Sequence, residues 1–395
     1  MSELKVNSIK GVGASSAAIT VNNTDGTCTA NITNNLSNRN LIINGAMQVA
    51  QRGTSSTING YGSVDRVRLS YNSSGLDEVP TQAQADVASG TTPYTSGFRK
   101  CFKITNGNQT SGAGAGDFIK FQYRLEAQDI TNSGWNYLSA SSYITLYFWV
   151  KSSVAQNFYG YIETFDGSGY LYPFETGSLS ADTWTKVTKT ISGNSNLTFN
   201  NDNGSGLQIE IHPFMGTNST ASGVALNTWA AYAAGTRTPD QTSTWFTTND
   251  ATFEITGVQL EVGSVATDFE HRSFGQELAL CQRYCQVLGG NQSQELLMHG
   301  TYNGTSAVTG FYEAAVQFRA RPTFSISNVS HVNCYGFNGT DSGSPTGMSL
   351  IGAMTDKHWI YIDSSLSSAS GTGGLTVMVR ASSTTACKFT LDAEL

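Results

Sequence analysis

Between residues 40 and 262, short segments rich in apolar and aromatic residues recur about every ten to twenty residues, and no helical pattern separates them. These segments span residues 40–54, 98–105, 117–126, 143–153, 157–165, 170–176, 183–191, 206–212 and 252–262. Gly, Asn and Ser, which tight turns favour, are abundant, while charged residues make up only 13% of the chain. The pattern predicts an all-β fold built around a jelly-roll sandwich of two sheets.

The last of these segments carries a signal for a β-bulge. Phe253 and Ile255 share one parity along the strand, whereas Val258, Leu260 and Val262 have the opposite parity, and Gly257 lies between the two sets. Side chains alternate between the faces of a strand, so an extra residue at the glycine would return both sets to the core. We therefore expect a bulge at Gly257.

The chain divides into four parts. Residues 1–39 contain two short strand patterns, which are too small to form a core and must dock on another unit. Residues 40–270 form the sandwich, residues 271–290 form a helical connector, and residues 291–395 contain further strand patterns. We expect the last part to be a second, smaller β-sandwich.

The connector is the segment with clear helix signals. Ser273 and Gln276 have the spacing of a capping box, and Gly289 with Gly290 marks the end. The apolar residues form two stripes, one of Leu278, Cys281 and Cys285 and the other of Leu280, Tyr284 and Leu288. A short helix with two apolar sides requires burial on both, so we expect it to pack between the domains or against its copies around a threefold axis.

Composition excludes several classes of protein. The formal charge is −7 and no run of Lys and Arg occurs, so the chain lacks the basic surface that nucleic-acid binding requires. No apolar run is long enough to be inserted across a membrane, and the polar N-terminus does not resemble a signal peptide. An even number of cysteines allows disulfides, but a long chain made in a reducing cytosol favours buried thiols. The cysteines are Cys28, Cys101, Cys281, Cys285, Cys334 and Cys387.

The sequence carries none of the common signatures of enzymes. The sequence has no GxSxG, Walker, HExxH or GxGxxG motif in a suitable context, and no set of His and Cys residues with the spacing of a zinc site. Asp129, Glu163, Asp166 and Glu175 could supply the carboxylate pair that glycoside cleavage needs. Acids beside β-turns more often form the turn or face solvent, so we expect a protein that is not an enzyme and holds no metal.

Several stretches of the sequence resemble known families. The central region contains, in this order, NLIINGAM, YITLYFWVKSS, ADTWTKVTKTI, NDNGSGLQI and FEITGVQLEVG, which together resemble the jelly-roll domain of carbohydrate-binding modules. A tighter resemblance, to tail fibres and receptor-binding proteins of tailed bacteriophages, especially those of marine bacteria, rests on NLIINGAMQVAQRGT, YGSVDRVRLS and residues 253–286. The opening SELKVNSIKG resembles the virion-attachment segments of cyanophage fibres.

This resemblance implies a structural protein of the virion, a tail fibre or receptor-binding adhesin that is assembled in the host cytoplasm and located on the phage tail. It implies a homotrimer whose N-terminal segment attaches to other tail, baseplate or nozzle proteins. Host adsorption would then rest on multivalent, non-catalytic binding to host surface polysaccharide or lipopolysaccharide. Two alternatives stay open: a capsid decoration or head-fibre protein without receptor binding, and a polysaccharide-degrading tailspike.

Aromatic residues are the candidates for binding a glycan. Sugars stack their C–H faces on aromatic rings, while amides and carboxylates bond their hydroxyl groups. The candidates in hairpins and loops are Trp135, Tyr137, Tyr159, Tyr161, Tyr170, Tyr172, Trp229, Tyr232 and Trp245. For each of them the alternative is a place in the core, and Trp149 and Trp184 are assigned to the core directly.

Many carbohydrate-binding sandwiches hold a structural calcium ion through acidic residues in the opening and closing strands. The corresponding places here carry Ala46, Met47 and Gln48, and Thr256, Gly257 and Gln259. Because Ca²⁺ takes several oxygen ligands, usually including carboxylates, the sequence departs from this pattern. We therefore expect neither calcium nor another cofactor.

Overall fold

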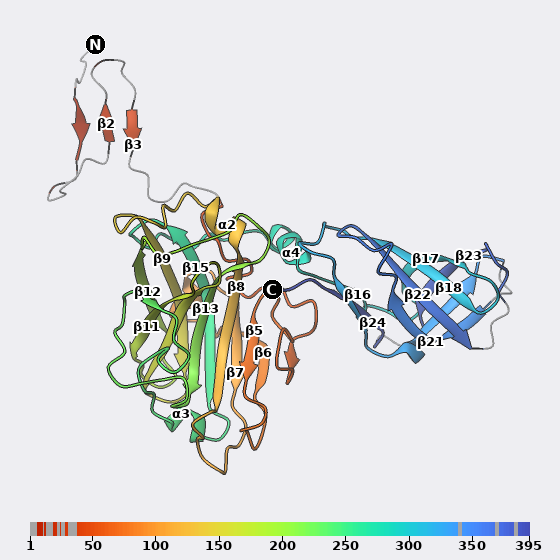
Figure 1. Cartoon of the computed structure of the whole chain (residues 1–395), viewed down its shortest axis with the longest axis horizontal. Coiled ribbons are helices and arrows are strands. Elements are labelled where there is room, and N and C mark those ends of the chain that lie inside the picture. The colour runs from red at the N-terminus through yellow and green to blue at the C-terminus, as the bar shows by residue number, and fades with distance from the viewer. Residues whose placement is uncertain are drawn as a thin grey trace.

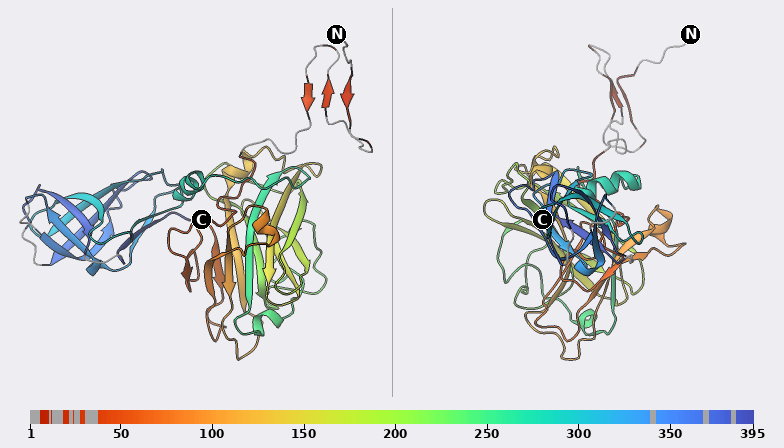
Figure 2. Two further views of the ribbon diagram at one scale, coloured as in Figure 1. Left: turned by 180° about the vertical axis from the view of Figure 1, so that it is seen from behind. Right: turned by 90° about the vertical axis from the view of Figure 1, so that its right-hand side faces the viewer.

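The computed structural model describes residues 6–10, 12, 19–21, 24, 28–30, 38–338, 342–367, 371–382 and 386–395. Figure 1 shows three β units in chain order: a small N-terminal sheet, a sandwich and a barrel, with helix α4 (Phe274–Gln282) between the last two. Figure 2 shows from two further sides that the N-terminal sheet stands clear of the sandwich. No helix in the described ranges is both long and apolar enough to cross a membrane.

The N-terminal sheet has three antiparallel strands, β1 (Ser8–Ile9), β2 (Ile19–Val21) and β3 (Cys28–Ala30). The sequence predicted the first two, while β3 was not predicted. The first predicted strand pattern included Leu4, and the two patterns were separated by the Gly/Ala/Ser-rich residues 11–17; Leu4 and most of residues 11–17 lie outside the described residues. Ile9 is exposed, as expected for a sheet that is too small to bury a core of its own.

Two six-stranded antiparallel sheets form the sandwich, which confirms the predicted fold class. Sheet I has the order β14 (Ala230–Ala231), β11 (Tyr170–Ser178), β10 (Asn157–Thr164), β13 (Ser205–Met215), β8 (Phe118–Glu126) and β5 (Arg68–Tyr71). Sheet II has the order β12 (Thr185–Ser192), β9 (Tyr143–Ser152), β15 (Thr252–Val262), β7 (Lys100–Thr105), β6 (Thr81–Asp86) and β4 (Ser55–Ser56). Three short helices lie in the connections: α1 (Thr92–Thr95), α2 (Ala127–Thr131) and α3 (Thr244–Thr247).

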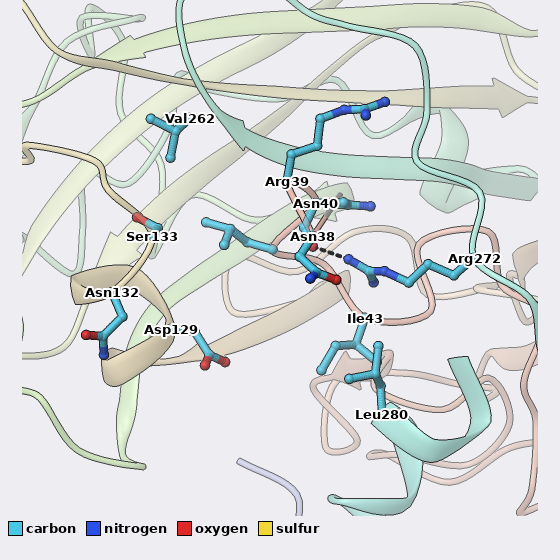
Figure 3. Close-up of a pocket in the computed structure, with 11 residues that line it drawn as sticks. Asn38, Arg39, Asn40, Ile43, Asp129, Asn132, Ser133, Val262, Arg272 and Leu280 are labelled. Carbon is cyan, nitrogen blue, oxygen red and sulfur yellow. Dashed lines mark hydrogen bonds between the residues drawn. The ribbon is translucent and has the colours of Figure 1, made fainter. Parts of the chain in front are cut away.

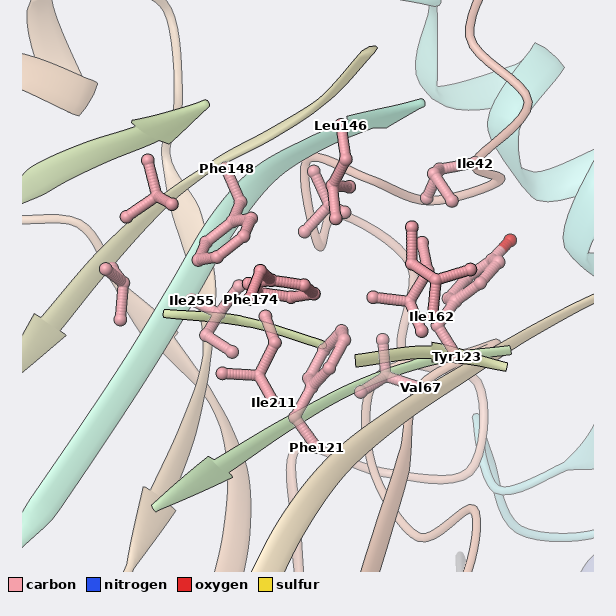
Figure 4. Close-up of a cluster of buried hydrophobic side chains, with 14 of the residues drawn as sticks. Ile42, Val67, Phe121, Tyr123, Leu146, Phe148, Ile162, Phe174, Ile211 and Ile255 are labelled. Atoms are coloured by element: carbon pink, nitrogen blue, oxygen red, sulfur yellow. The ribbon is translucent and has the colours of Figure 1, made fainter. Parts of the chain in front are cut away.

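The inner faces of the two sheets form one hydrophobic core. Phe121 and Ile211 from sheet I meet Phe148 and Ile255 from sheet II, and all four are fully buried (Figure 4). Each such side chain contributes about 1.5–3 kcal/mol by leaving water. The alternation that buries one side of each strand also turns the opposite side outward, and this sets up the outer faces described below.

The predicted bulge in β15 is confirmed. The register between β15 and β9 shifts between Thr256 and Gln259, and Gly257 has φ of +62°. A Cβ atom at this glycine would lie 2.6 Å from the ring of Phe98, so the position requires glycine for space as well as for conformation. As expected, Phe253, Ile255, Val258 and Leu260 are fully buried. The prediction is wrong for Val262, which is 40% exposed at the end of the strand and lines a groove there.

Helix α4 begins as predicted and ends earlier than predicted. Ser273 and Gln276 form the expected capping box, but the helix stops at Gln282 and Cys285 opens strand β16 (Cys285–Gly289). The expectation of a helix as far as Gly289 is therefore wrong. The helix ends early because of a tertiary contact: β16 pairs with β24 (Lys388–Asp392), about a hundred residues later in the chain.

The C-terminal part is the predicted second, smaller β region, but six of its strands close into a barrel where we expected a sandwich. In order around the barrel the strands are β17 (Leu296–Tyr302), β18 (Ala307–Glu313), β22 (Trp359–Ser367), β21 (Ser342–Leu350), β20 (Val332–Gly336) and β23 (Thr376–Ala381). A short 3-10 turn, η1 (Val329–His331), precedes β20. Strands β16, β24 and β19 (Thr323–Ile326) form a three-stranded sheet between barrel and sandwich.

A buried set of charges ties the end of β24 back to the sandwich. Glu394 is ion-paired with Arg52 and Arg66, and its side chain is only 3% exposed. The guanidinium of Arg66 stacks on the ring of Tyr284, 3.4 Å from its centroid. Asp392 adds an ion pair to Arg52 at 2.8 Å. We call Arg52, Arg66 and Glu394 the clamp.

The cysteines whose side chains are described are all buried. They are Cys101, Cys281, Cys285, Cys334 and Cys387, and each is a free thiol. Burial raises the pKa of these thiols above the ordinary value, which keeps them protonated and unreactive at neutral pH. The side chain of Cys28 lies outside the described part of the chain.

Candidate functional site

The outer face of sheet I carries an ordered row of polar side chains. In β8 the residues Phe121 and Tyr123 face the core, so Lys120, Gln122 and Arg124 point outward. In β13 the same alternation turns the side chains of Gln208, Glu210 and His212 outward. Strand register places Tyr161 opposite Glu210, Glu210 opposite Gln122, and Gln122 opposite Arg68. The row therefore crosses four adjacent strands.

Glu210 lies at the centre of this row and is 1% exposed. Its carboxylate accepts hydrogen bonds from Lys120 Nζ at 2.8 Å, Gln122 Nε2 at 2.6 Å and Gln208 Nε2 at 2.6 Å. Nε2 of His212 lies 3.2 Å from the same group. Burial alone would raise the pKa of Glu210, but Lys120 and the bond from His212 hold it well below its usual range. Glu210 is a fixed anion whose oxygens are already occupied.

A second carboxylate, Glu163 on β10, lies beside this anion. Gln208 Nε2 is 3.4 Å from one oxygen of Glu163 and 2.6 Å from Glu210. Burial, and then the charge of Glu210, raises the pKa of Glu163 to about 7. The side chain is half-buried, so this group can exchange a proton with solvent near neutral pH.

The other acids considered for glycoside cleavage do not join this pair. Asp166 accepts hydrogen bonds from the backbone and side chain of Asn200, and so stabilises a loop. Glu175 accepts one from Asn157 at 2.7 Å. Asp129 lies on α2, where burial and then Glu126 raise its pKa to about 6. No group of three or more His, Cys, Asp or Glu side chains placed to hold a metal occurs in the described ranges.

Four of the aromatic candidates are interior residues, and the sequence prediction is corrected for them. They are Trp135, Tyr161, Tyr172 and Trp245, all buried. Trp245 lies on α3, donates a hydrogen bond to Thr252 O and packs on Phe253. Tyr161 does face outward, where it packs with Leu171 and Met215 and lies near Arg237 of the loop of residues 216–243, which we call the covering loop. These rings have no free face on which a sugar could stack.

The other five candidates retain some exposure. Tyr137, Tyr170 and Trp229 are half-buried against the main core, and Trp229 donates a hydrogen bond to Ser192 O. Tyr159 lies opposite Glu175 on the outer face of sheet I. The exposed Tyr232 accepts a hydrogen bond from Arg237 in the covering loop. The structure thus brings Tyr159 and Tyr232 to the outer side of sheet I. It leaves Tyr137, Tyr170 and Trp229 half-buried against the core.

Another part of the outer face carries exposed and half-buried side chains. Half-buried Arg68 donates a hydrogen bond to Gln122, and half-buried Arg124 donates one to Gln208 at 2.7 Å. The guanidinium of Arg124 lies 5.4 Å from the ring of Phe165, which is exposed. We call Arg68, Gln122, Arg124, Glu163 and Phe165 the sheet I patch. Glu163 was considered from the sequence, and a polar residue at every second position of FIKFQYRLE was the available signal for Gln122 and Arg124.

A groove of about 550 Å³ lies where the sandwich meets α4 (Figure 3). Its apolar lining includes Leu41, Ile43, Val262 and Leu280, while Arg272 crosses it and donates a hydrogen bond to Asn40 O. Leu280 comes from one of the two predicted stripes and is 36% exposed. The other apolar residues predicted for the connector pack within their own chain: Cys281, Tyr284 and Cys285 are buried, and Leu278 is half-buried.

Comparison with known proteins finds no matching family model and no matching curated protein. Among solved structures, the enzymatically active domain of tailspike protein 4 of Bacteriophage CBA120 is 11% identical, with 57% of this chain and 22% of that chain covered at a TM-score of 0.30. A CBM4 structure is 12% identical, with 56% and 98% covered at a TM-score of 0.27.

A family 11 carbohydrate-binding module from Clostridium thermocellum, in complex with a mixed-linked tetrasaccharide, is 9% identical, with 54% and 98% covered at a TM-score of 0.25. The present chain spans about a fifth of the length of the tailspike chain that it matches. This chain is similar in structure, at low TM-scores, to carbohydrate-binding modules and to a phage tailspike domain.

Proposed function

We propose that this chain is a non-catalytic adhesin of a tailed-phage virion, a tail fibre that binds glycans on the host surface. The observation that carries the proposal is the sheet I patch. Its arginine and carboxylate groups are held in place by buried amides, and an exposed aromatic ring lies at its edge. Donors, acceptors and a stacking ring on one rigid face are the groups that bind a sugar's hydroxyls and its C–H face.

The chemistry of the neighbouring carboxylates favours binding over cleavage. A glycosidase needs one carboxylate to deliver a proton and a second to act on the sugar or on water. Glu163 has the pKa of a proton donor, but the oxygens of Glu210 are occupied by side-chain donors and shielded from solvent. The pair therefore lacks a second accessible carboxylate.

Two features at one end of the sandwich support a place in a larger particle (Figure 1). The exposed Leu280 and Phe274 on α4 and the apolar groove beside them suit a contact with further copies of the chain, in a homotrimer. The N-terminal sheet is too small to be stable alone and suits docking on another tail, baseplate or nozzle protein. Three chains would engage the cell surface together, so weak single contacts gain by effective concentration.

The test uses fluorescently labelled full chain on host cells and on a glycan array. We expect Arg124→Ala and Phe165→Ala each to weaken cell binding about tenfold or more, because each removes a group of the patch. Arg380→Ala is the matched control, since Arg380 stacks on Tyr335 of the barrel in the same manner. If the barrel variant lost binding and the patch variants kept it, the assignment of the patch would be wrong.

Two further observations separate the alternatives. Oligosaccharides released from host capsule or lipopolysaccharide by the purified chain would overturn the non-catalytic assignment and favour a tailspike. Electron microscopy of particles labelled with antibody against this chain decides between the tail and the capsid. Label on the capsid would contradict a tail fibre and favour a decoration or head-fibre protein.

A further inference from the structure

The outer face of sheet II is crossed by the tether that follows β15. Glu261 binds the backbone and side chain of Thr267, and Gln259 Oε1 accepts a hydrogen bond from the backbone of Glu270. These contacts hold residues 263–273 against the sheet. As a result the side chains of Phe269 and His271 lie over the outward residues of β9.

A cavity of about 290 Å³ lies between the tether and the sheet. Four aromatic rings line it, from Phe98, Tyr147, Trp149 and Phe269, and the charged residues beside them are Lys186 and Asp268. The volume is near the lower end for small-molecule sites. Trp149 is half-buried here, which corrects its assignment to the core, because it alternates with the buried Phe148 and Val150 and so faces outward.

The wall of this cavity is a packed aromatic set. Phe98 and Phe269 are in edge contact with centroids 4.8 Å apart, and Phe269 and His271 have the same separation. Nε2 of His271 lies 3.0 Å from Ser96 O. Gly97 allows this approach, since a Cβ atom there would lie 2.8 Å from the imidazole and φ is +97°. Backbone and side chains therefore fix the shape of the cavity.

One polar group at this cavity has no partner among the residues that the structure describes. The side chain of Tyr147 is 1% exposed, and its hydroxyl makes no hydrogen bond within the part of the chain that the structure describes. Lys186 lies over the ring, 4.1 Å from its centroid, and leaves the hydroxyl unpaired. Buried hydroxyls are paired in the great majority of cases, because an unpaired one costs about 1–3 kcal/mol. An unpaired hydroxyl beside an aromatic cavity points to a ligand that supplies the missing hydrogen-bond partner.

We propose that this cavity binds one uncharged sugar ring. Aromatic walls suit the C–H face of a pyranose, and the Tyr147 hydroxyl can bond one of its hydroxyls. One cation, Lys186, and one anion, Asp268, flank the cavity, so its lining favours neither an acidic nor a basic ligand. The site goes beyond the proposed function, because it lies on the sheet opposite the sheet I patch and shares no residue with it.

The experiment measures binding of three probes to the full chain by saturation-transfer NMR: methyl β-glucopyranoside, methyl β-galactopyranoside and N-acetylglucosamine. We expect saturable binding of at least one probe with a Kd of about 1 mM or weaker, as fits a single ring. Tyr147→Phe removes only the unpaired hydroxyl and should weaken that binding about fivefold. The same change should leave the Tm equal or higher, since it removes an unsatisfied buried group.

A second variant and a control make the outcome decisive. Trp149→Phe should weaken binding and remove the fluorescence change that the sugar induces, whereas Arg380→Ala on the barrel, which belongs to neither site, should leave the Kd for the probe unchanged. The proposal is wrong if none of the three probes binds, or if Tyr147→Phe and Trp149→Phe both bind like the unchanged chain. The proposed function has its own test, because cell binding is assigned to variants of the opposite sheet.

Discussion

At the residue scale, the bulge of β15 depends on Gly257. Its φ of +62° is unfavourable for other residues, and a Cβ atom would contact the buried ring of Phe98. We expect Gly257→Ala to lower the free energy of unfolding by about 2–5 kcal/mol, the sum of left-handed strain and overpacking. Urea unfolding followed by tryptophan fluorescence measures the change.

Gly177 is the matched control for this prediction. It has φ of +76°, yet nothing lies within 4 Å of an added Cβ atom. Gly177→Ala should therefore cost only the conformational part, about 1–2 kcal/mol. Equal losses at the two glycines would show that the ring of Phe98 yields without cost, contrary to the prediction.

The protonation of a single residue, Glu163, makes the free energy of unfolding depend on pH. Its pKa is raised from 4.5 to about 7 in the folded chain, so the folded state binds more protons than the unfolded state between these values. The stability that this proton provides is present below about pH 4.5 and is lost as the pH rises through about 7. We expect Glu163→Gln to flatten this part of the pH profile. Urea unfolding at a series of pH values tests it, and an unchanged slope would contradict it.

At the scale of elements, α4 presents its exposed apolar residue at the groove of the joint. Leu280 lines the groove with Ile43 and Val262, and its own chain leaves it 36% exposed. We expect Leu280→Glu to leave the chain folded and to convert the proposed trimer into monomers, because the contact would bury an unpaired charge. Mass from light scattering measures this. Ile58→Glu, at an exposed aliphatic residue outside the groove, should stay trimeric, and a wild-type chain of monomeric mass would contradict the assembly.

Local signals predicted some elements well, while distant partners decided the rest. Parity and a glycine were sufficient for the bulge at Gly257, and Ser273 with Gln276 for the start of α4. The strand that begins at Cys285 could not be predicted, because its partner β24 lies about a hundred residues away. Closure of the barrel depends on the pairing of β17 with β23, which is equally distant.

The sequence prediction failed for aromatic residues that were judged by their type and not by their place in a helix or strand. Trp245 was expected in an open loop, but α3 carries it over the end of the core. Trp149 was assigned to the core, yet it shares the parity of Lys151 and lines the cavity on sheet II. The polar row of sheet I was readable from alternation, but its convergence on Glu210 depends on the order of strands in the sheet.

At the scale of the whole molecule, the clamp joins the end of β24 to the sandwich. Glu394 is buried between Arg52 and Arg66, so Glu394→Gln would leave two buried cations without their shared partner. We expect a loss of about 3–5 kcal/mol in the free energy of unfolding. Thermal and urea unfolding measure it. Asp86→Asn, which breaks the exposed pair with Lys100, should change stability by less than about 0.5 kcal/mol, and a similar loss in both variants would contradict the role of the clamp.

The pairing of β16 with β24 has a mechanical consequence. Strand β16 leaves the sandwich and β24 returns to it, and Cys285 lies opposite Asp392 where both strands are held: Gln51 donates a hydrogen bond to Cys285 O, and Arg52 binds Asp392. A force that pulls the barrel away from the sandwich is therefore shared by two strands in parallel. Separating these two paired strands by a force along them requires their hydrogen bonds to be sheared together, whereas a single linker would simply straighten under the same force.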